Sequence, residues 1–107
     1  MTEQKTRAQQ LVGDVAPKLA ELTDEVLFGD VWARADLSRR DRSMVTVAAL
    51  TALGGRTEQL RSHLSLALDN GVTEEELVEA ATHLAFYAGW PAGMTAATTL
   101  KEVLRER

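Results

Sequence analysis

The sequence contains no cysteine, and this absence removes several classes of chemistry at once. Disulfide bonds, thiolate metal sites and cysteine-based peroxidase or reductase reactions all require a thiol that the chain does not have. Aromatic residues make up only 5% of the 107 residues, so a hydrophobic core has to be built from Leu, Val and Ala. Small side chains bury little apolar area each, and we therefore expect the protein to associate through helix faces.

The sequence also lacks an excess of positive charge and a long apolar run. Its 12 Lys and Arg against 16 Asp and Glu give a net charge of −4, which argues against a nucleic-acid binder that relies on phosphate contacts. The longest apolar stretch, MVTVAALTAL, is about half of a membrane span, and the N-terminal MTEQKTRAQQ lacks the apolar run of a signal peptide. We expect a cytoplasmic protein without membrane or nucleic-acid partners.

Helix start and stop signals divide the first half of the chain. After a short helical pattern at the N-terminus, Pro17 is expected to start a helix that runs to about Phe28 and is closed by Gly29. Ser38 is a good N-cap for a further helix that reaches about Leu53, where two glycines end it.

The second half carries similar signals. Thr57 is expected to cap a helix that ends at residues 70–71, and Thr73 with Glu76 has the spacing of a capping box at the start of the next helix. Because the connecting turn DNGVT is short, we expect these two helices to be antiparallel neighbours. After a Gly-Trp-Pro break, Pro91 starts the last helix.

No segment shows the sustained two-residue alternation of a half-buried strand. The sequence therefore predicts an all-α protein, a compact bundle of five to six helices that forms a single domain over residues 1–107.

Two histidines stand on predicted helices. His63 lies beside Leu60 and Leu64, on or next to an apolar stripe, and His83 precedes Tyr87 by one helical turn. In an antiparallel pair, position 63 comes level with about position 81, so both histidines could face one pocket with Tyr87. A histidine on an apolar face is more often a hydrogen-bonded structural residue than a catalytic one, and both interpretations of His63 stay open.

Arginines crowd the start of the helix after Ser38, in RADLSRRDRS. As a solvated face this run needs no explanation, but it would also suit a carboxylate ligand through bidentate contacts. Arg61, one turn from His63 but displaced around the helix, is a further candidate. Two histidines without fixed ligand spacing are weak evidence for a metal site, and we expect none. The arginines of the run are Arg34, Arg39, Arg40 and Arg42.

Several motifs recur in an order that resembles the carboxymuconolactone decarboxylase family. They are Trp-x-Arg before the capped helix, Asp-Arg-Ser at its start, a His followed eight residues later by Gly, Thr-x-x-Glu, and Tyr-x-Gly-x-Pro. The resemblance runs from about residue 29 to the C-terminus. It implies an all-helical subunit in a homotrimer or a hexameric trimer of dimers, with active sites near subunit contacts.

The chain departs from relatives in this superfamily at defined positions. Alkylhydroperoxidase-type proteins place a Cys-x-x-Cys where this chain has Arg56 and Gln59, and a proton-relaying glutamate near Ser43 or Met44. Neither the thiolates nor the relay is present, so a cysteine-dependent peroxidase is excluded.

Members from the protocatechuate pathway resemble Tyr-Cys-Gly-x-Pro-Ala-x-Asn. This chain instead has Ala88, Trp90 and Met94, and the last two make the expected pocket more apolar. Substrate identity is left open by these differences.

The resemblance implies a cofactor-free decarboxylase of 4-carboxymuconolactone or a related carboxylated lactone, in aromatic-compound breakdown through the β-ketoadipate pathway. In this interpretation His63 is the general acid, and Trp90 excludes water. Two alternatives remain: a related lyase or isomerase acting on another carbonyl compound, and a non-catalytic oligomeric binding scaffold. The candidate catalytic residues are His63, His83 and Tyr87, and the candidate substrate-binding residues are Arg39, Arg42, Arg61, Trp90 and Met94.

Overall fold

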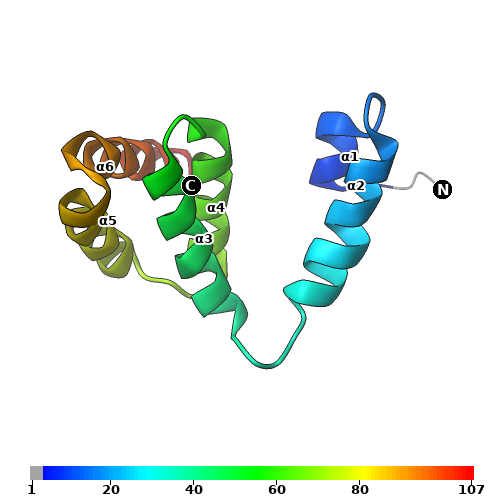
Figure 1. Ribbon diagram of the computed structural model, residues 1–107, viewed down its shortest axis with the longest axis horizontal. Helices are drawn as coiled ribbons and strands as arrows, with labels where there is room; N and C mark the ends of the chain where they lie inside the picture. The colour runs from blue at the N-terminus through cyan, green and yellow to red at the C-terminus, as the bar shows by residue number, and fades with distance from the viewer. Residues whose placement is uncertain (1–3) are drawn as a thin grey trace. The chain divides into compact units, whose positions relative to one another are not determined.

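The computed structural model describes residues 4–107, and every regular element in that range is a helix (Figure 1). The prediction of an all-α fold is confirmed. The chain forms two compact units, one up to Ser38 and one from Arg39 to Arg107; a single domain over the whole chain stays a prediction. The elements are α1 (Arg7–Val12), α2 (Pro17–Leu22), the π-helix η1 (Thr23–Val31), α3 (Arg39–Leu53), α4 (Thr57–Asp69), α5 (Glu74–Ala88) and α6 (Trp90–Glu106).

The helix that begins at Pro17 does not end near Phe28, so that prediction is wrong. It continues without a break into the π-helix, where the backbone N–H of Trp32 donates to the carbonyl of Leu27 at 2.9 Å. Gly29 does not end the helix. A glycine is needed there because the backbone leaves no room for a side chain. A Cβ atom at this position would lie 2.8 Å from the carbonyl oxygen of Asp24, five residues earlier, and wide π-helical turns bring these groups together.

Helix starts in the second unit follow the sequence in part. The Thr73 hydroxyl accepts from the Glu76 N–H at 3.1 Å, and the Glu76 carboxylate accepts from the Thr73 N–H at 2.9 Å, so the predicted capping box is confirmed. Thr57 is the first residue of α4 and not its N-cap, which is Arg56 without a capping side-chain bond. Trp90 starts α6 one residue before Pro91.

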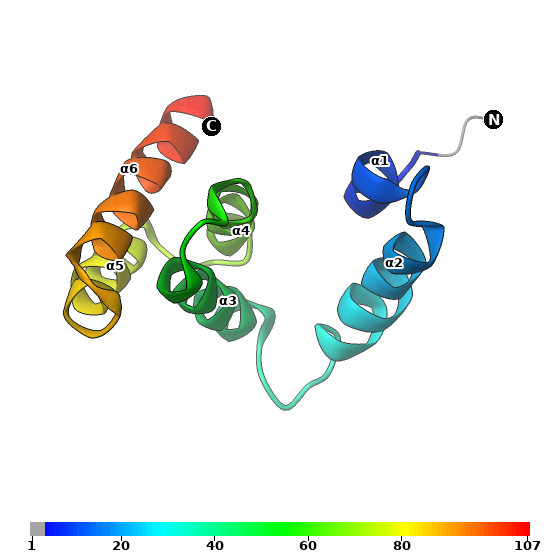
Figure 2. The same cartoon turned by 45° about the horizontal axis from the view of Figure 1, so that its top comes forward.

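The core of the second unit is built from small and medium aliphatic side chains of all four helices. Helices α5 and α6 lie side by side, as do α3 and α4 (Figure 2). Gly93 permits the α5–α6 approach, because a Cβ there would lie 2.8 Å from the Cβ of Ala85. The buried cluster comprises Val47, Leu60, Leu64, Ala67, Val72, Leu77, Ala81, Ala96, Leu100 and Val103.

Helices α4 and α5 are not the packed antiparallel pair that their short connection suggests. Helix α4 packs on α3 and α6, whereas α5 packs on α6 and α3. The connection itself is anchored in the core: Gly71 has a φ of +99°, and Val72 is buried and donates its N–H to the carbonyl of Ala67 at 2.9 Å. The connection thus carries the chain away from α4, and the prediction that α4 and α5 are packed neighbours is wrong.

None of the helices in residues 4–107 combines the length and the apolar character needed to cross a membrane.

Candidate functional site

His63 lies on α4 at the border of the core. The neighbouring positions Leu60, Leu64 and Ala67 are buried, while His63 is half-buried and its Nδ1 atom is enclosed. A titratable ring thus lies at the edge of an apolar core.

Arg61 points to the opposite flank of α4, since two residues of helix turn the side-chain direction by about 200°. Its guanidinium contacts Glu102 at 2.5 Å and Glu106 at 3.5 Å on α6, and Glu58 at 3.9 Å on its own helix. The hydrogen bond to Glu102 raises the pKa of Arg61 above its ordinary value, and the three nearby carboxylates add to this. A substrate carboxylate would have to displace one of these partners.

The structure brings His83 and Tyr87 together. Their ring centroids are 4.8 Å apart on α5, and both side chains are exposed. Phe86, the residue before Tyr87, meets Trp90 edge to face at 5.5 Å. Four exposed apolar side chains stand at the end of α5 and the start of α6, and we call them the aromatic face: Phe86, Tyr87, Trp90 and Met94.

The sequence placed His63 beside His83 through an antiparallel pairing of their two helices. That pairing is absent, because α4 and α5 do not pack as a pair. The helices that pack on α4 are α3 and α6 (Figure 1). The shared pocket of the two histidines stays a prediction.

The arginine run lies at the start of α3. Arg39 is exposed and Arg42 is half-buried, whereas Arg40 contacts Glu76 of α5 and Asp41 at 3.1 Å. The Thr73 backbone N–H and then Arg40 hold the pKa of the Glu76 carboxyl below its usual value.

A hydrogen bond between α3 and the end of α4 shows how far the arginine run lies from His63 along α4. The Asn70 side chain donates to the fully buried Ser43 hydroxyl at 3.0 Å, which ties the first turns of α3 to the end of α4. Asn70 is seven residues beyond His63, so this end of α3 lies about 10 Å from His63 along the axis of α4. Within one subunit the arginine run and His63 are therefore separated.

Sequence reasoning missed a cavity of about 280 Å³ between the end of α3, the start of α4 and the α5–α6 junction. Leu50, Leu60 and Pro91 contribute apolar walls, and Arg56 lines it as a charged side chain. In the sequence, Arg56 stands out only as the residue at the position of a cysteine in alkylhydroperoxidase-type proteins. The signal that could have found it is its spacing, because Arg56 precedes His63 by seven residues, two helical turns.

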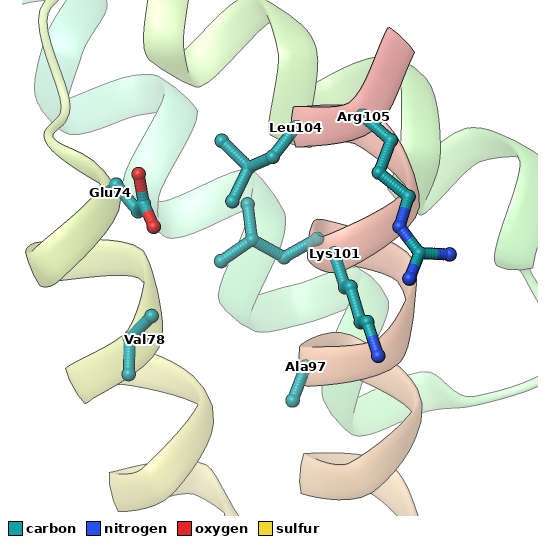
Figure 3. Close-up of a pocket in the computed structure, with 7 residues that line it drawn as sticks. Glu74, Val78, Ala97, Lys101, Leu104 and Arg105 are labelled. Atoms are coloured by element: carbon teal, nitrogen blue, oxygen red, sulfur yellow. The ribbon is translucent and has the colours of Figure 1, made fainter.

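Two further hollows have other linings. A groove of about 440 Å³ runs between α5 and α6, where Glu74 lies across from Lys101 and Arg105 (Figure 3). A third, of about 540 Å³, belongs to α1, α2 and η1. Among residues 4–107, no three His, Asp or Glu side chains come close enough to hold a metal ion.

Comparison with known proteins adds family information to this geometry. Residues 17–102 match the model of the carboxymuconolactone decarboxylase family. A 4-carboxymuconolactone decarboxylase of Acinetobacter baylyi is 38% identical over 100 residues, which is 94% of this chain and 74% of that protein. The nitrosuccinic acid decarboxylase npaB of Metarhizium robertsii is 35% identical over 86 residues, 80% of this chain and 59% of that protein.

Proposed function

Because the chain belongs to the carboxymuconolactone decarboxylase family, we propose that it is a decarboxylase of a carboxylated lactone such as 4-carboxymuconolactone. The observation that carries this proposal is the match to a 4-carboxymuconolactone decarboxylase along 94% of the chain. A second relative is also named for removing a carboxyl group, from a different acid. The two names together support decarboxylation more broadly than they support one substrate.

The proposed reaction draws its driving force from the substrate. The bond between the γ carbon of the unsaturated lactone and its carboxylate breaks, and CO₂ leaves. The electron pair spreads through the double bond to the lactone carbonyl as an extended enolate, so the substrate is its own electron sink. The protein then has to hold the carboxylates, stabilise the developing oxyanion and deliver one proton to carbon.

We assign the proton delivery to His63. An imidazole titrates near neutral pH, so it can carry a proton and recover it from water after each turnover. Its position supports the role, because a half-buried ring at the edge of the core is shielded from bulk water and still reachable. The alternative role, a structural histidine that only packs, remains the competing interpretation that the activity test has to exclude.

We propose that the remaining catalytic residues act in a site shared between subunits. His83 and Tyr87 are exposed and adjacent, so they suit donation to an oxyanion on a substrate that a second copy holds against them. Trp90 and Met94 beside them would exclude water from that contact. Since α4 and α5 do not pack as a pair, a homotrimer or hexamer would bring His63 of one copy to this face of another.

Carboxylate binding is proposed for the arginine run. Arg39 and Arg42 lie in the first turn of α3, where the backbone N–H groups of a helix start also favour anions. A substrate-binding role of Arg61 also stays a prediction. Three carboxylates of the protein would compete with the substrate for its guanidinium. A cytoplasmic location also stays a prediction, which cell fractionation tests.

The test of the proposed function is loss of the ultraviolet absorbance of 4-carboxymuconolactone in the presence of the purified protein. Turnover by the wild type supports the substrate assignment. Absence of turnover at high protein concentration contradicts it.

A further inference from the structure

The cavity between the end of α3, the start of α4 and the α5–α6 junction differs from the other hollows in its charge. Among the described residues that line it, Arg56 is the single charged one. The α5–α6 groove, by contrast, sets the Glu74 carboxylate opposite Lys101 and Arg105 (Figure 3). A lone guanidinium without a lining carboxylate is complementary to an anion.

Arg56 is held in place from one side. Its Nη1 donates to the carbonyl of Gly54 at 2.7 Å, across the turn in which Gly54 and Gly55 both have positive φ. A guanidinium has several N–H donors, so this bond orients the group and leaves others for a ligand. An arginine oriented in this way loses little side-chain freedom when it binds a carboxylate bidentately.

The remaining lining sets the class of ligand. Hydroxyl groups of Thr51, Thr57 and Thr95 provide polar contacts, while Leu50 and Leu60 provide methyl groups. The Thr51 hydroxyl donates to the Val47 carbonyl at 2.8 Å, so towards the cavity its oxygen acts as an acceptor. A volume of about 280 Å³ lies near the lower end for ligand cavities, which fits a compact molecule.

The cavity also stands in a defined relation to His63. Arg56 precedes α4 as its N-cap, and Leu60, which also lines the cavity, lies one turn before His63 on the same flank of α4. The rise between Arg56 and His63 along α4 is about 10 Å. A small molecule anchored at Arg56 can therefore extend along this flank towards His63.

We infer that this cavity is a carboxylate subsite in which Arg56 binds one carboxylate of a compact acid. The inference rests on the proposed function in one respect: the bound acid is the substrate that His63 protonates. The arginine run at α3 is not part of this subsite.

The experiment combines kinetics with direct binding on the full chain. Decarboxylation of 4-carboxymuconolactone is measured for wild type, Arg56→Gln and Arg56→Lys, and calorimetry follows binding of benzoate and of its neutral analogue benzamide. Arg105→Gln is the matched control, an arginine of the α5–α6 groove. Circular dichroism verifies that each variant folds.

The inference predicts that Arg56→Gln raises KM and weakens benzoate binding by roughly 10- to 100-fold, the range for a charge-assisted contact. The value of kcat should change less, benzamide binding should not change, and Arg56→Lys should recover part of the loss. Arg105→Gln should behave as wild type.

Two results would overturn the inference while leaving the proposed function intact: a normal KM for Arg56→Gln, or wild-type turnover without benzoate binding. A failure of the proposed function gives a different result. A wild type that decarboxylates nothing, yet binds benzoate in an Arg56-dependent way, would keep the subsite and reject the substrate.

Discussion

At the scale of single residues, the contacts that the sequence predicts are local ones. The capping box of α5 involves Thr73 and Glu76, three residues apart, and its two hydrogen bonds follow from helix geometry alone. The contact between Arg61 and Glu102 joins positions 41 residues apart. No periodicity in the sequence pairs these two, because the pairing depends on how α4 and α6 meet.

The Glu76 carboxylate gives a pH-dependent prediction. Its pKa in the folded protein is lowered by the Thr73 N–H and then by Arg40, so its charge stabilises the fold at every pH above the ordinary value of 4.5. That contribution is lost as the pH falls through the lowered pKa. We expect Glu76→Gln to have a lower Tm than wild type at pH 7, and the gap to close in acid.

Thermal unfolding followed by circular dichroism between pH 3 and pH 7, roughly the range of carboxyl titration, measures this gap. Glutamine can still accept the bond from the Thr73 N–H, so the comparison isolates the charge. Glu75→Gln, on the exposed side of the same turn, is the control. A gap that stays constant with pH would show that the charge of Glu76 does not stabilise the fold.

At the scale of elements, the all-helical content and most helix starts follow from the sequence. The pairing of the helices and the π-helix do not. Gly29 has the signature of a helix stop, and it instead lies inside a π-helix whose turns bring it against the Asp24 carbonyl. The short turn before Thr73 indicated an α4–α5 pair, yet the burial of Val72 directs α5 to α6 and α3. In both cases tertiary packing overrides a local signal.

Gly93 gives an element-scale prediction. A Cβ at this position would lie 2.8 Å from the Ala85 Cβ and 2.9 Å from the Ala81 carbonyl oxygen, so α6 has to move away from α5. We expect Gly93→Ala to lower the free energy of unfolding by about 1–3 kcal/mol, in spite of the better helix propensity of alanine.

Urea unfolding of the two proteins measures this change, with Thr98→Ala on the exposed side of α6 as control. The control should stay within about 0.5 kcal/mol of wild type. An unchanged or increased stability of Gly93→Ala would mean that α5 and α6 do not approach as closely as described.

At the scale of the whole molecule, the aromatic face is the feature that a single subunit does not explain. Phe86 and Tyr87 are 75% and 80% exposed, although the chain has few aromatic residues to place in a core. Exposed apolar side chains that gather on one surface are typical of protein contacts. We propose that this face is covered by another copy in the homo-oligomer.

Phe86→Asp tests this proposal, because a buried carboxylate without a partner strongly disfavours an apolar contact. We expect light scattering after gel filtration to show a smaller assembly for Phe86→Asp and an unchanged one for Val45→Asp. Val45 is an exposed apolar residue of α3, outside the aromatic face, and serves as the matched control. Equal assembly sizes for Phe86→Asp and wild type would exclude the aromatic face as the contact.

The central claim is that His63 carries the proton, and one measurement tests it directly. The ultraviolet assay of 4-carboxymuconolactone is run on wild type, His63→Ala, His63→Gln and Ser62→Ala, the last as a neighbouring control on α4. Assembly size and Tm are recorded for each, and His63→Gln keeps a similar shape if the smaller alanine disturbs folding.

We expect both His63 variants to lose roughly 100- to 10,000-fold in kcat at an unchanged assembly size, while Ser62→Ala retains activity. Full turnover by a folded His63→Gln would contradict this expectation, and His63 would then be a structural histidine at the edge of the core.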